Sequence, residues 1–463
     1  MTADPRPGEL SRAELRRRRR AVIEEGAPRE GVDIIRPVEQ AIVVAVQLPG
    51  VSDETVAASL DELEALLDTA GASVVERVVQ HRDTPEPATF IGKGKVAELR
   101  ELSATLGADA VVFDEDLSPA QQRNLEEGIG QKVLDRTIVI LDIFAQHATS
   151  REGKAQVELA QLTYLLPRLR GWGDALSRQA GGRAAGGAGI GGRGPGETQL
   201  EVDRRRLNRR ITALRRDLRR YEQTRQTKAA ERERTPVQHV ALVGYTNAGK
   251  SSLLNRLTGA GVLVEDQLFA TLDPTVRRLH LPDGRSVALS DTVGFVRKLP
   301  HGLIEAFTST LEESTRADLL LHVVDANHPE ALAQVDAVHD VLREIHADDV
   351  PALVVLNKSD LASTRAVREL VRHVGTDDDA VVSVSAVTGD GCAELLERVA
   401  QLLPDPRVRV QALVPWERSD LVARAHEHGD VHAAKHLDNG TLLDATVPAP
   451  TARELAAYPA DAG

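Results

Sequence analysis

The strongest chemical signal in the sequence is the loop of residues 244–251, which reads G-Y-T-N-A-G-K-S. The apolar run 240–243 precedes it and the helical pattern 252–257 follows it, as expected for a phosphate-binding loop of the form G-x-x-x-x-G-K-S. Its glycines let backbone N–H groups turn toward phosphates, and the helix N-terminus adds partial positive charge. We expect Lys250 to reach the β- and γ-phosphates and the Ser251 hydroxyl to ligate Mg²⁺. The spacing therefore predicts a nucleoside triphosphate site rather than an ordinary strand-to-helix turn.

Two further loops would complete the phosphate side of this site. In S-D-T-V-G, which follows an apolar run, we expect Asp291 to hold Mg²⁺ through water and the Gly294 N–H to face the γ-phosphate. Between the two loops, residues 269–275 read F-A-T-L-D-P-T. A threonine there can close over the γ-phosphate and give Mg²⁺ another oxygen ligand. We choose Thr271 for this role, with Thr275 as the nearest competitor, and we expect Mg²⁺ as the cofactor.

The choice of base is predicted by two short motifs near the ends of later apolar runs. In residues 357–360, N-K-S-D, the carboxylate of Asp360 can accept both N1–H and N2–H of guanine, a donor pattern that adenine lacks. Lys358 would cover the ring, and Asn357 would tie this loop to the phosphate loop. Residues 385–387, S-A-V, would contact the guanine carbonyl through backbone N–H groups. The motifs together predict a GTPase.

We expect Lys250, Thr271 and Gly294 to act in catalysis. A Ras-like enzyme would carry Gln after the glycine to orient the attacking water, but this chain has Phe295. Slow hydrolysis until a partner docks is therefore expected. The predicted GTP-binding residues are Gly244, Tyr245, Thr246, Asn247, Ala248, Gly249, Lys250, Ser251, Phe269, Ala270, Thr271, Leu272, Asp273, Asp291, Thr292, Val293, Gly294, Asn357, Lys358, Ser359, Asp360, Ser385, Ala386 and Val387.

Length and composition predict a multidomain cytoplasmic protein. A chain of 463 residues is too long for one core, so about three or four domains are expected. No run approaches the ~20 apolar residues of a membrane span, and no signal-peptide pattern is found. The single Cys392 suits a reducing compartment, and its position at a probable helix start argues against a catalytic role. We expect a monomer when the protein is free.

Charge is unevenly distributed along the chain. The net charge is −13, yet residues 151–234 carry 20 Lys and Arg against 10 Asp and Glu, so the remainder carries about −23. An acidic body with one basic element suggests docked contact with a polyanion. For the basic tail of residues 1–36, which holds Arg16–Arg20, a solvated flexible arm is favoured over RNA contact.

The predicted fold class is α/β throughout most of the chain. Residues 37–150 alternate strand and helix, which predicts an N-terminal α/β domain with a mostly parallel sheet. The segment Gly92–Lys95 is favoured as an ordinary turn over a phosphate site, because it lacks the required spacing. The expected strands are 41–46, 73–79, 108–113 and 137–141, and the expected helices are 53–70, 93–106 and 119–129.

Residues 151–235 predict a long antiparallel helical hairpin with a glycine-rich loop at 181–196. We expect Arg178, Arg183 and Arg193 near this tip to bind RNA, although a solvated, ion-paired helical face is the alternative for the arginines. The root of the hairpin would pack apolar residues of the second helix against those of the first, namely Leu207, Ile211, Leu214 and Leu218 against Val157, Leu162, Leu165 and Leu169.

Residues 236–404 predict a Ras-like doubly wound P-loop domain, with strands at 239–243, 287–289, 319–324, 352–356 and 380–384. Residues 405–463 predict a small C-terminal α+β domain of short elements. Its histidines carry no matching cysteines, so metal binding there is disfavoured; they are His426, His428, His432 and His436.

The chain resembles the HflX-type GTPases, an Obg-HflX-like branch of the translation-factor-related P-loop GTPases. Phe295 is similar to that family's hydrophobic replacement of the catalytic Gln. The resemblance also rests on segments 117–119, 123–126, 135–137, 141–144, 150–154, 156–162, 191–197, 203–205 and 269–273. It implies binding to rRNA of the large ribosomal subunit, with the hairpin tip near the peptidyl-transferase region. It further implies GTP-dependent splitting of stalled or idle ribosomes under stress, and use of ATP as a side activity.

Two other functions stay open from the residues alone. The protein could be a GTPase in ribosomal-subunit assembly or RNA modification, which predicts affinity for isolated precursor subunits. It could instead be a non-catalytic GTP-gated binding module on a protein or a membrane. The acidic body and the lack of a lipidation motif or amphipathic anchor count against a membrane.

Overall fold

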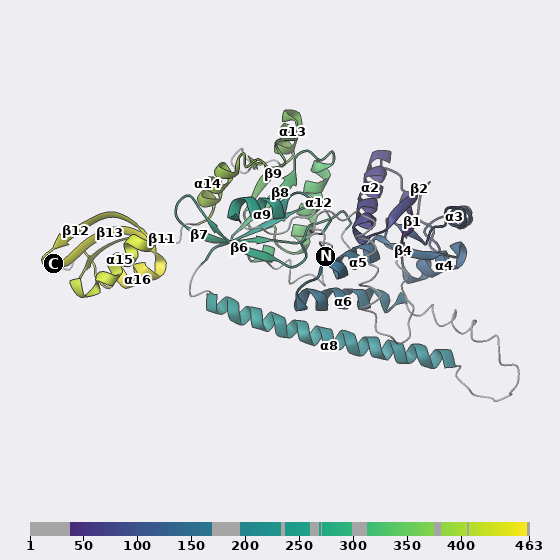
Figure 1. The fold of residues 1–463 in the computed structure, drawn as a ribbon, viewed down its shortest axis with the longest axis horizontal. Coiled ribbons are helices and arrows are strands. Elements are labelled where there is room, and N and C mark those ends of the chain that lie inside the picture. Colours follow the sequence, from purple (N-terminus) through teal and green to yellow (C-terminus); the bar gives the residue numbers. More distant parts are fainter. Residues whose placement is uncertain are drawn as a thin grey trace, which may run out of the picture.

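The computed structural model describes residues 38–168, 195–232, 237–259, 268–269, 271–298, 313–374, 381–404 and 407–460. It shows an α/β protein whose three sheets follow one another along the chain, with a long helix running beneath the first two (Figure 1). The basic tail, most of the glycine-rich loop and the three arginines Arg178, Arg183 and Arg193 lie outside the described residues. None of the described helices is long and apolar enough to cross a membrane.

The N-terminal sheet is parallel, in the order β2-β1-β3-β4. Its helices begin where local caps predict. Ser52 caps α2 and Ser118 forms a capping box with Gln121 at the start of α4, while Gly71 ends α2 in the left-handed conformation. The elements are β1 (Gln40–Gln47), α2 (Asp53–Ala70), β2 (Ser73–His81), α3 (Lys93–Leu106), β3 (Ala110–Phe113), α4 (Pro119–Ile129), β4 (Lys132–Asp135) and α5 (Arg136–His147).

One expected strand is wrong. Residues 137–141 lie in α5, and the fourth strand is the shorter β4 just before it. The Asp135 side chain accepts a hydrogen bond from the Ile138 N–H and so caps α5 at the end of the strand. The apolar run suggested a strand because α5 is buried on more than one side. A short run of β-branched residues does not distinguish a buried helix from a strand.

Helices α6 (Arg151–Leu165) and α8 (Pro195–Arg232) lie side by side and run in opposite directions (Figure 1). On α8, Ile211 and Leu214 are buried, and Val157 is buried on α6. Leu165, which was expected in this interface, is 40% exposed at the last residue of α6. The buried face of α6 joins the N-terminal core through Val157 and Ala160, so the packing of α6 is shared between α8 and the N-terminal domain.

The second sheet is doubly wound, in the order β10-β9-β8-β5-β7-β6, and is parallel except for the edge strand β6. Sequence reasoning missed β6 because it is largely exposed and so lacks an apolar run. The strands are β5 (His239–Gly244), β6 (Thr275–His280), β7 (Ser286–Asp291), β8 (Leu319–Asp325), β9 (Ala352–Asn357) and β10 (Val381–Ser383); the helices are α9 (Lys250–Thr258), α12 (Ala331–Glu344), α13 (Thr364–Val374) and α14 (Cys392–Leu402).

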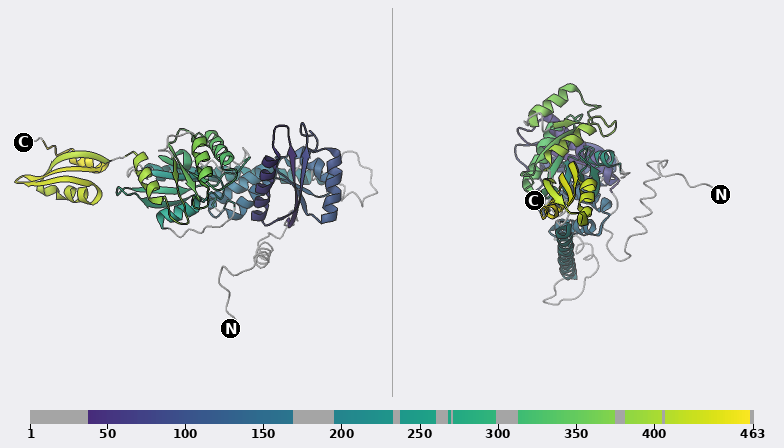
Figure 2. Two further views of the ribbon diagram at one scale, coloured as in Figure 1. Left: turned by 90° about the horizontal axis from the view of Figure 1, so that it is seen from above. Right: turned by 90° about the vertical axis from the view of Figure 1, so that its left-hand side faces the viewer.

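The C-terminal unit is a three-stranded antiparallel sheet with its own apolar core, set at one end of the molecule (Figure 2). His432 contacts the Thr446 hydroxyl and His436 contacts the Thr441 hydroxyl, so both imidazoles have partners within the sheet. The elements are β11 (Arg407–Val414), η4 (Trp416–Arg418), α15 (Ser419–His428), β12 (Asp430–Leu437), β13 (Gly440–Pro448) and α16 (Ala449–Leu455).

Candidate nucleotide-binding site

The phosphate-binding loop joins the end of β5 to the start of α9. Gly249 has φ of 91°, and a Cβ at this position would collide with the amide nitrogen of Asn357, so the residue must be glycine. The buried Lys250 donates from Nζ to the carbonyl oxygens of Gly244 (3.0 Å) and Tyr245 (2.8 Å). Burial lowers the pKa of Lys250 to about 8, against the opposing effect of Asp291. The loop therefore holds an ammonium group folded back over its own backbone.

Three oxygen-bearing side chains meet beside this loop. Ser251 Oγ donates to Asp291 Oδ2 at 2.6 Å, and Thr271 Oγ1 lies 3.0 Å from Ser251 Oγ and 3.1 Å from Asp291 Oδ2. Asp291 Oδ1 is buried and has no hydrogen-bond partner among the described residues. Hard oxygen donors with one unsatisfied carboxylate oxygen suit Mg²⁺. The structure brings Thr271 into this cluster, whereas Thr275 begins the edge strand β6.

Burial raises the pKa of Asp291, although the charge on Lys250 and the hydroxyls of Ser251 and Thr271 oppose the shift. A carboxylate in this position gains from a nearby cation, because the cation offsets the cost of removing the charge from water. The electrostatics of the cluster therefore agree with its donor set. Both fit a hard cation held between the phosphate loop and the end of β7.

The loop after β7 crosses directly over the phosphate loop. A Cβ on Gly294 would lie 2.7 Å from Thr246 Cγ2 and 3.2 Å from Lys250 Nζ, so only glycine allows this approach. Next in the chain, the Phe295 N–H donates to the Gly244 carbonyl (3.1 Å) and the Phe295 carbonyl accepts from the Thr246 N–H (2.7 Å). The Phe295 side chain is 1% exposed and packs in the core between the sheet and α12. This position therefore serves packing and offers no group to orient water.

The base-side loops are joined through Asn357. Its Nδ2 donates to the Ala248 carbonyl (2.8 Å) in the phosphate loop, and its Oδ1 accepts from the Ala386 N–H (3.0 Å). The backbone N–H of Ala386, one of those expected to meet a guanine carbonyl, is thus directed at Asn357. Lys358 pairs with Asp325 at 2.7 Å, and Asp360 is exposed. These contacts fix the two base-side loops to each other and to the phosphate loop.

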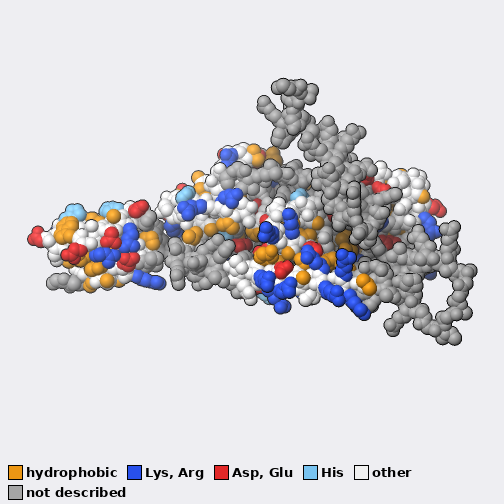
Figure 3. Space-filling view, turned by 60° about the horizontal axis from the view of Figure 1, so that its bottom comes forward, with side chains coloured by type: hydrophobic (Ala, Val, Ile, Leu, Met, Phe, Trp, Pro, Cys, Tyr) orange, Lys and Arg blue, Asp and Glu red, His pale blue; other side chains and the backbone are white. Residues whose placement is uncertain are grey.

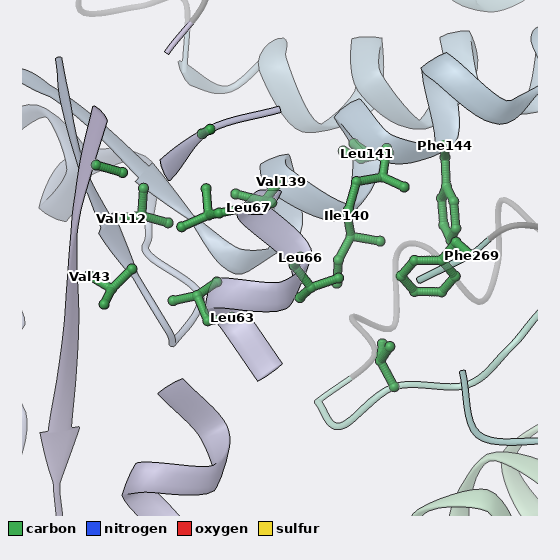
Figure 4. Close-up of a cluster of buried hydrophobic side chains, with 14 of the residues drawn as sticks. Val43, Leu63, Leu66, Leu67, Val112, Val139, Ile140, Leu141, Phe144 and Phe269 are labelled. Atoms are coloured by element: carbon green, nitrogen blue, oxygen red, sulfur yellow. The ribbon is translucent and has the colours of Figure 1, made fainter. Parts of the chain in front are cut away.

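Several side chains expected at the nucleotide face the N-terminal domain instead. Phe269 packs edge-on against Phe144 of α5, with ring centroids 4.6 Å apart (Figure 4), and Leu272 belongs to the same buried cluster. The Tyr245 hydroxyl donates to the Glu62 carboxylate of α2. Only the backbones of these residues are therefore available to a nucleotide, and their side chains form an interface between domains.

Asp273 accepts four hydrogen bonds across this interface. Its Oδ2 accepts from the Thr149 N–H (2.9 Å), the Thr149 hydroxyl (2.6 Å) and the Ser150 N–H (2.7 Å), and its Oδ1 accepts from the Ser150 hydroxyl. Although burial alone would raise it, these hydrogen bonds lower the pKa of Asp273. More than a hundred residues separate the partners along the chain, so no local spacing could have indicated the contact.

A second polar network joins the loop after β7 to the N-terminal sheet. Lys298 Nζ lies 2.7 Å from Asp114 Oδ2, and Arg136 Nη1 lies 2.7 Å from Asp114 Oδ1. Burial alone would raise the pKa of Asp114, but Arg136 and Lys298 lower it. The Arg297 N–H also donates to the Tyr245 hydroxyl at 2.6 Å. Sequence reasoning assigned no role to Asp114, Arg136, Arg297 or Lys298, because contacts between residues far apart in the chain leave no periodic signal.

Three family models match successive parts of the chain. Residues 57–145 match the GTP-binding GTPase N-terminal family, and residues 147–232 match the GTP-binding GTPase middle region. Residues 239–358, which hold the phosphate loop and the first two residues of the N-K-S-D motif, match the 50S ribosome-binding GTPase family. The order of the three matches follows the N-terminal sheet, the paired helices α6 and α8, and the doubly wound sheet.

Whole-chain relatives agree with these matches. The GTPase HflX of Lacrimispora saccharolytica is 43% identical over 414 residues, which cover 89% of this chain and 95% of the relative. The GTPase HflX of Escherichia coli strain K12 is 43% identical over 393 residues, covering 84% and 88%. Among solved structures, a GTP-binding protein from Sulfolobus solfataricus in complex with GDP is 25% identical, with a TM-score of 0.40 and coverage of 79% and 98%. On the strength of the whole-chain relatives, this chain belongs to the HflX family of GTPases.

Proposed function

We propose that this GTPase binds the large ribosomal subunit and uses GTP to dissociate stalled or idle ribosomes in the cytoplasm. The observation that carries the proposal is the basic surface of α8. Helix α8 packs against α6, and the N-terminus of α6 contacts a loop of the nucleotide site. The family description of residues 239–358 as a 50S ribosome-binding GTPase supports the choice of partner. Stress would be the setting in which idle ribosomes accumulate.

The basic surface of α8 lies away from its buried seam. Figure 3 shows Lys and Arg side chains gathered over this part of the molecule. A helix that presents many guanidinium groups on one surface can neutralise successive phosphates of a polyanion. The exposed arginines of α8 are Arg204, Arg205, Arg206, Arg209, Arg210, Arg215, Arg216, Arg219 and Arg220. We propose that they extend the RNA contact assigned to Arg178, Arg183 and Arg193, which lie outside the described residues.

At the nucleotide site we propose that Lys250 leaves the carbonyls of its own loop to meet the β- and γ-phosphates. The Ser251 and Thr271 oxygens would hold Mg²⁺, with Asp291 acting through water, and the cation would neutralise charge on the phosphates. The Gly294 N–H would face the γ-phosphate. Asp360 would select guanine, and hydrolysis of ATP would be a weaker side activity.

The proposal that a partner stimulates hydrolysis is supported by the position of Phe295. Its ring is held in the core, so the free protein has no side chain at that position to align the attacking water. Groups supplied in trans raise the rate of other GTPases by about 10³–10⁵-fold. We propose that the ribosome supplies or orders such a group, and we expect at least about tenfold stimulation here.

The test is a density-gradient profile of assembled ribosomes incubated with GTP and protein over a range of salt. Wild type should convert assembled ribosomes to subunits. A variant that replaces residues 181–196 with a short neutral linker, and the Arg215→Gln/Arg219→Gln variant, should split poorly and lose part of the salt dependence of binding. Arg365→Gln, which removes an exposed arginine of α13, is the matched control and should split normally.

Three outcomes would contradict the proposal. Wild type that leaves ribosomes assembled but binds isolated precursor subunits would indicate an assembly or RNA-modification factor. Binding that depends on GTP without hydrolysis would indicate a GTP-gated module. Normal splitting by the α8 variant and by the variant without the loop would show that the helical pair is only a spacer.

A further inference from the structure

We propose that Asp273 is a positioning residue that couples the GTP-bound placement of Thr271 to the N-terminus of α6. The inference rests on the proposed GTP site, and it adds a defined connection from that site to the helical pair. Asp273 itself would touch neither nucleotide nor metal. It would act through Thr271 on one side and through the cap of α6 on the other.

The connection begins with the donors around the carboxylate. Two backbone N–H groups and two hydroxyls, all from Thr149 and Ser150, point at the two oxygens of Asp273. Ser150 is the N-cap of α6, and its Oγ also accepts from the Gly153 N–H at 2.8 Å. Because an ionised carboxylate can only accept, the Ser150 hydroxyl donates to Asp273 while it accepts from the helix. The carboxylate thus completes the cap of α6 from another domain.

The contact between Asp273 and the first turn of α6 leaves no room for a side chain at position 153. A Cβ on Gly153 would lie 2.5 Å from Asp273 Oδ1 and 3.0 Å from Ser150 Oγ, so the first turn of α6 admits the carboxylate only because it carries glycine there. An incidental surface contact would not need such an opening. The fit indicates a docking position for one specific side chain.

The other end of the connection is Thr271, two residues earlier. Two residues span at most about 7 Å, so Thr271 and Asp273 cannot move independently by much. Leu272 between them is 3% exposed and packs in the core shared with α5 and α6. When Thr271 lies beside Ser251 and Asp291, the Asp273 carboxylate reaches the N-cap of α6. A Thr271 withdrawn from that cluster would pull Asp273 away from Thr149 and Ser150.

This coupling acts in both directions by linkage. A triphosphate that draws Thr271 inward favours the capped α6, and a capped α6 favours the triphosphate over the diphosphate. Helix α6 packs against α8, so its first turn is the point at which the nucleotide would influence the helical pair. A partner that strains α6 would, by the same contact, change the affinity for GTP.

The experiment measures affinities of the full-length protein for GDP and for a non-hydrolysable GTP analogue. Asp273→Ala should lower the ratio of analogue to GDP affinity by at least about fivefold, the lower end of typical coupling. Thr149→Val removes one donor while keeping the Ser150 cap, and it should lower the ratio less. Glu158→Gln, which breaks the α6–α8 ion pair with Arg210, is the matched control and should leave the ratio unchanged.

Hydrogen exchange at the Gly153 and Lys154 amides provides a readout that general destabilisation would not reproduce. In wild type these amides should exchange more slowly with the analogue than with GDP, and in Asp273→Ala the difference should disappear. Equal ratios in wild type and both variants, or equal protection in both nucleotides, would overturn the inference. If wild type bound neither nucleotide, the proposed GTP site would fail instead, so the two failures are distinguishable.

Discussion

Burial of Lys250 sets the charge of the phosphate loop before any nucleotide arrives. Its ammonium group is satisfied by two backbone carbonyls, yet desolvation still lowers its pKa to about 8, with Asp291 opposing. A bound phosphate favours the ammonium and must raise that pKa. Nucleotide binding above pH ~8 therefore requires proton uptake by the protein.

We predict that GDP affinity is greatest below pH ~8 and falls by up to about tenfold per unit as pH rises above it, until the pKa of the complex is reached. Titration calorimetry at about pH 9 in two buffers of different ionisation enthalpy should show proton uptake. Lys250→Arg keeps its charge in this range, so its pH profile should be flat, whatever its absolute affinity. A flat profile for wild type would contradict the prediction.

The second prediction at the residue scale concerns base selection. Asp360→Asn should weaken GTP binding by roughly 1–3 kcal/mol or more, because the new amide donates where guanine also donates. Affinity for xanthosine triphosphate should rise, since xanthine offers an acceptor there. Direct titration with both nucleotides decides the matter, and unchanged GTP affinity would show that the base site lies elsewhere.

Sequence reasoning predicted which side chains lie together when their motifs follow adjacent parallel strands. Ser251 and Asp291 do lie together, because loops after adjacent parallel strands meet at one edge of a sheet. Tyr245 and Asp273 were named for the nucleotide, but their side chains turn to another domain. A motif fixes the backbone path of a loop more strongly than the direction of each side chain within it.

At the scale of elements, helices were predictable where their caps are local. The expected bounds of α2 and α4 agree with the structure because Ser52 and Ser118 mark their starts and glycines mark their ends. The strand expected at residues 137–141 failed because tertiary burial gave α5 a nearly continuous apolar sequence. Strand β6 was missed for the opposite reason, since an exposed edge strand has little apolar pattern.

The N-terminus of α6 offers a test in which helix propensity and packing have opposite effects on the free energy of unfolding. Gly→Ala near a helix start normally stabilises by about 0.5–1 kcal/mol. Gly153→Ala should instead lower the free energy of unfolding by about 1–3 kcal/mol, because its Cβ would overlap Asp273 and Ser150. Gly94→Ala near the start of α3, where a Cβ would meet nothing within 4 Å, is the matched control. Urea unfolding of both variants measures the change in the free energy of unfolding. Stabilisation by Gly153→Ala would contradict the packing at this cap.

At the scale of the whole molecule, the N-terminal domain rests on both loops that would respond to the γ-phosphate. The 271–273 segment packs against α5 and α6. In the other loop, Lys298 forms an ion pair at the end of a strand of the N-terminal sheet, and the Arg297 N–H donates to the Tyr245 hydroxyl. The C-terminal sheet has a separate core. Domains that share buried polar groups unfold together, whereas a unit with its own core can unfold alone.

We predict that calorimetry shows one transition for the N-terminal and nucleotide domains and another for the C-terminal unit. Tyr245→Phe leaves Glu62 and the Arg297 N–H without this partner, so it should lower the stability of the shared transition by about 1–3 kcal/mol. The C-terminal transition is the internal control and should not move. An N-terminal transition that is unaffected by both GDP and Tyr245→Phe would show that the interface does not couple the two domains.

The apolar character of these loops also limits which modules can be exchanged. Phe269, Leu272, Val293 and Val296 are all buried in one cluster with residues of α5 and α6. An excised nucleotide domain would present them to water, and a chimera with the polar loops of another GTPase would leave unfilled volume beside Phe144. We therefore expect the two domains to be exchangeable only together, and a change of volume in either loop to need a compensating change across the interface.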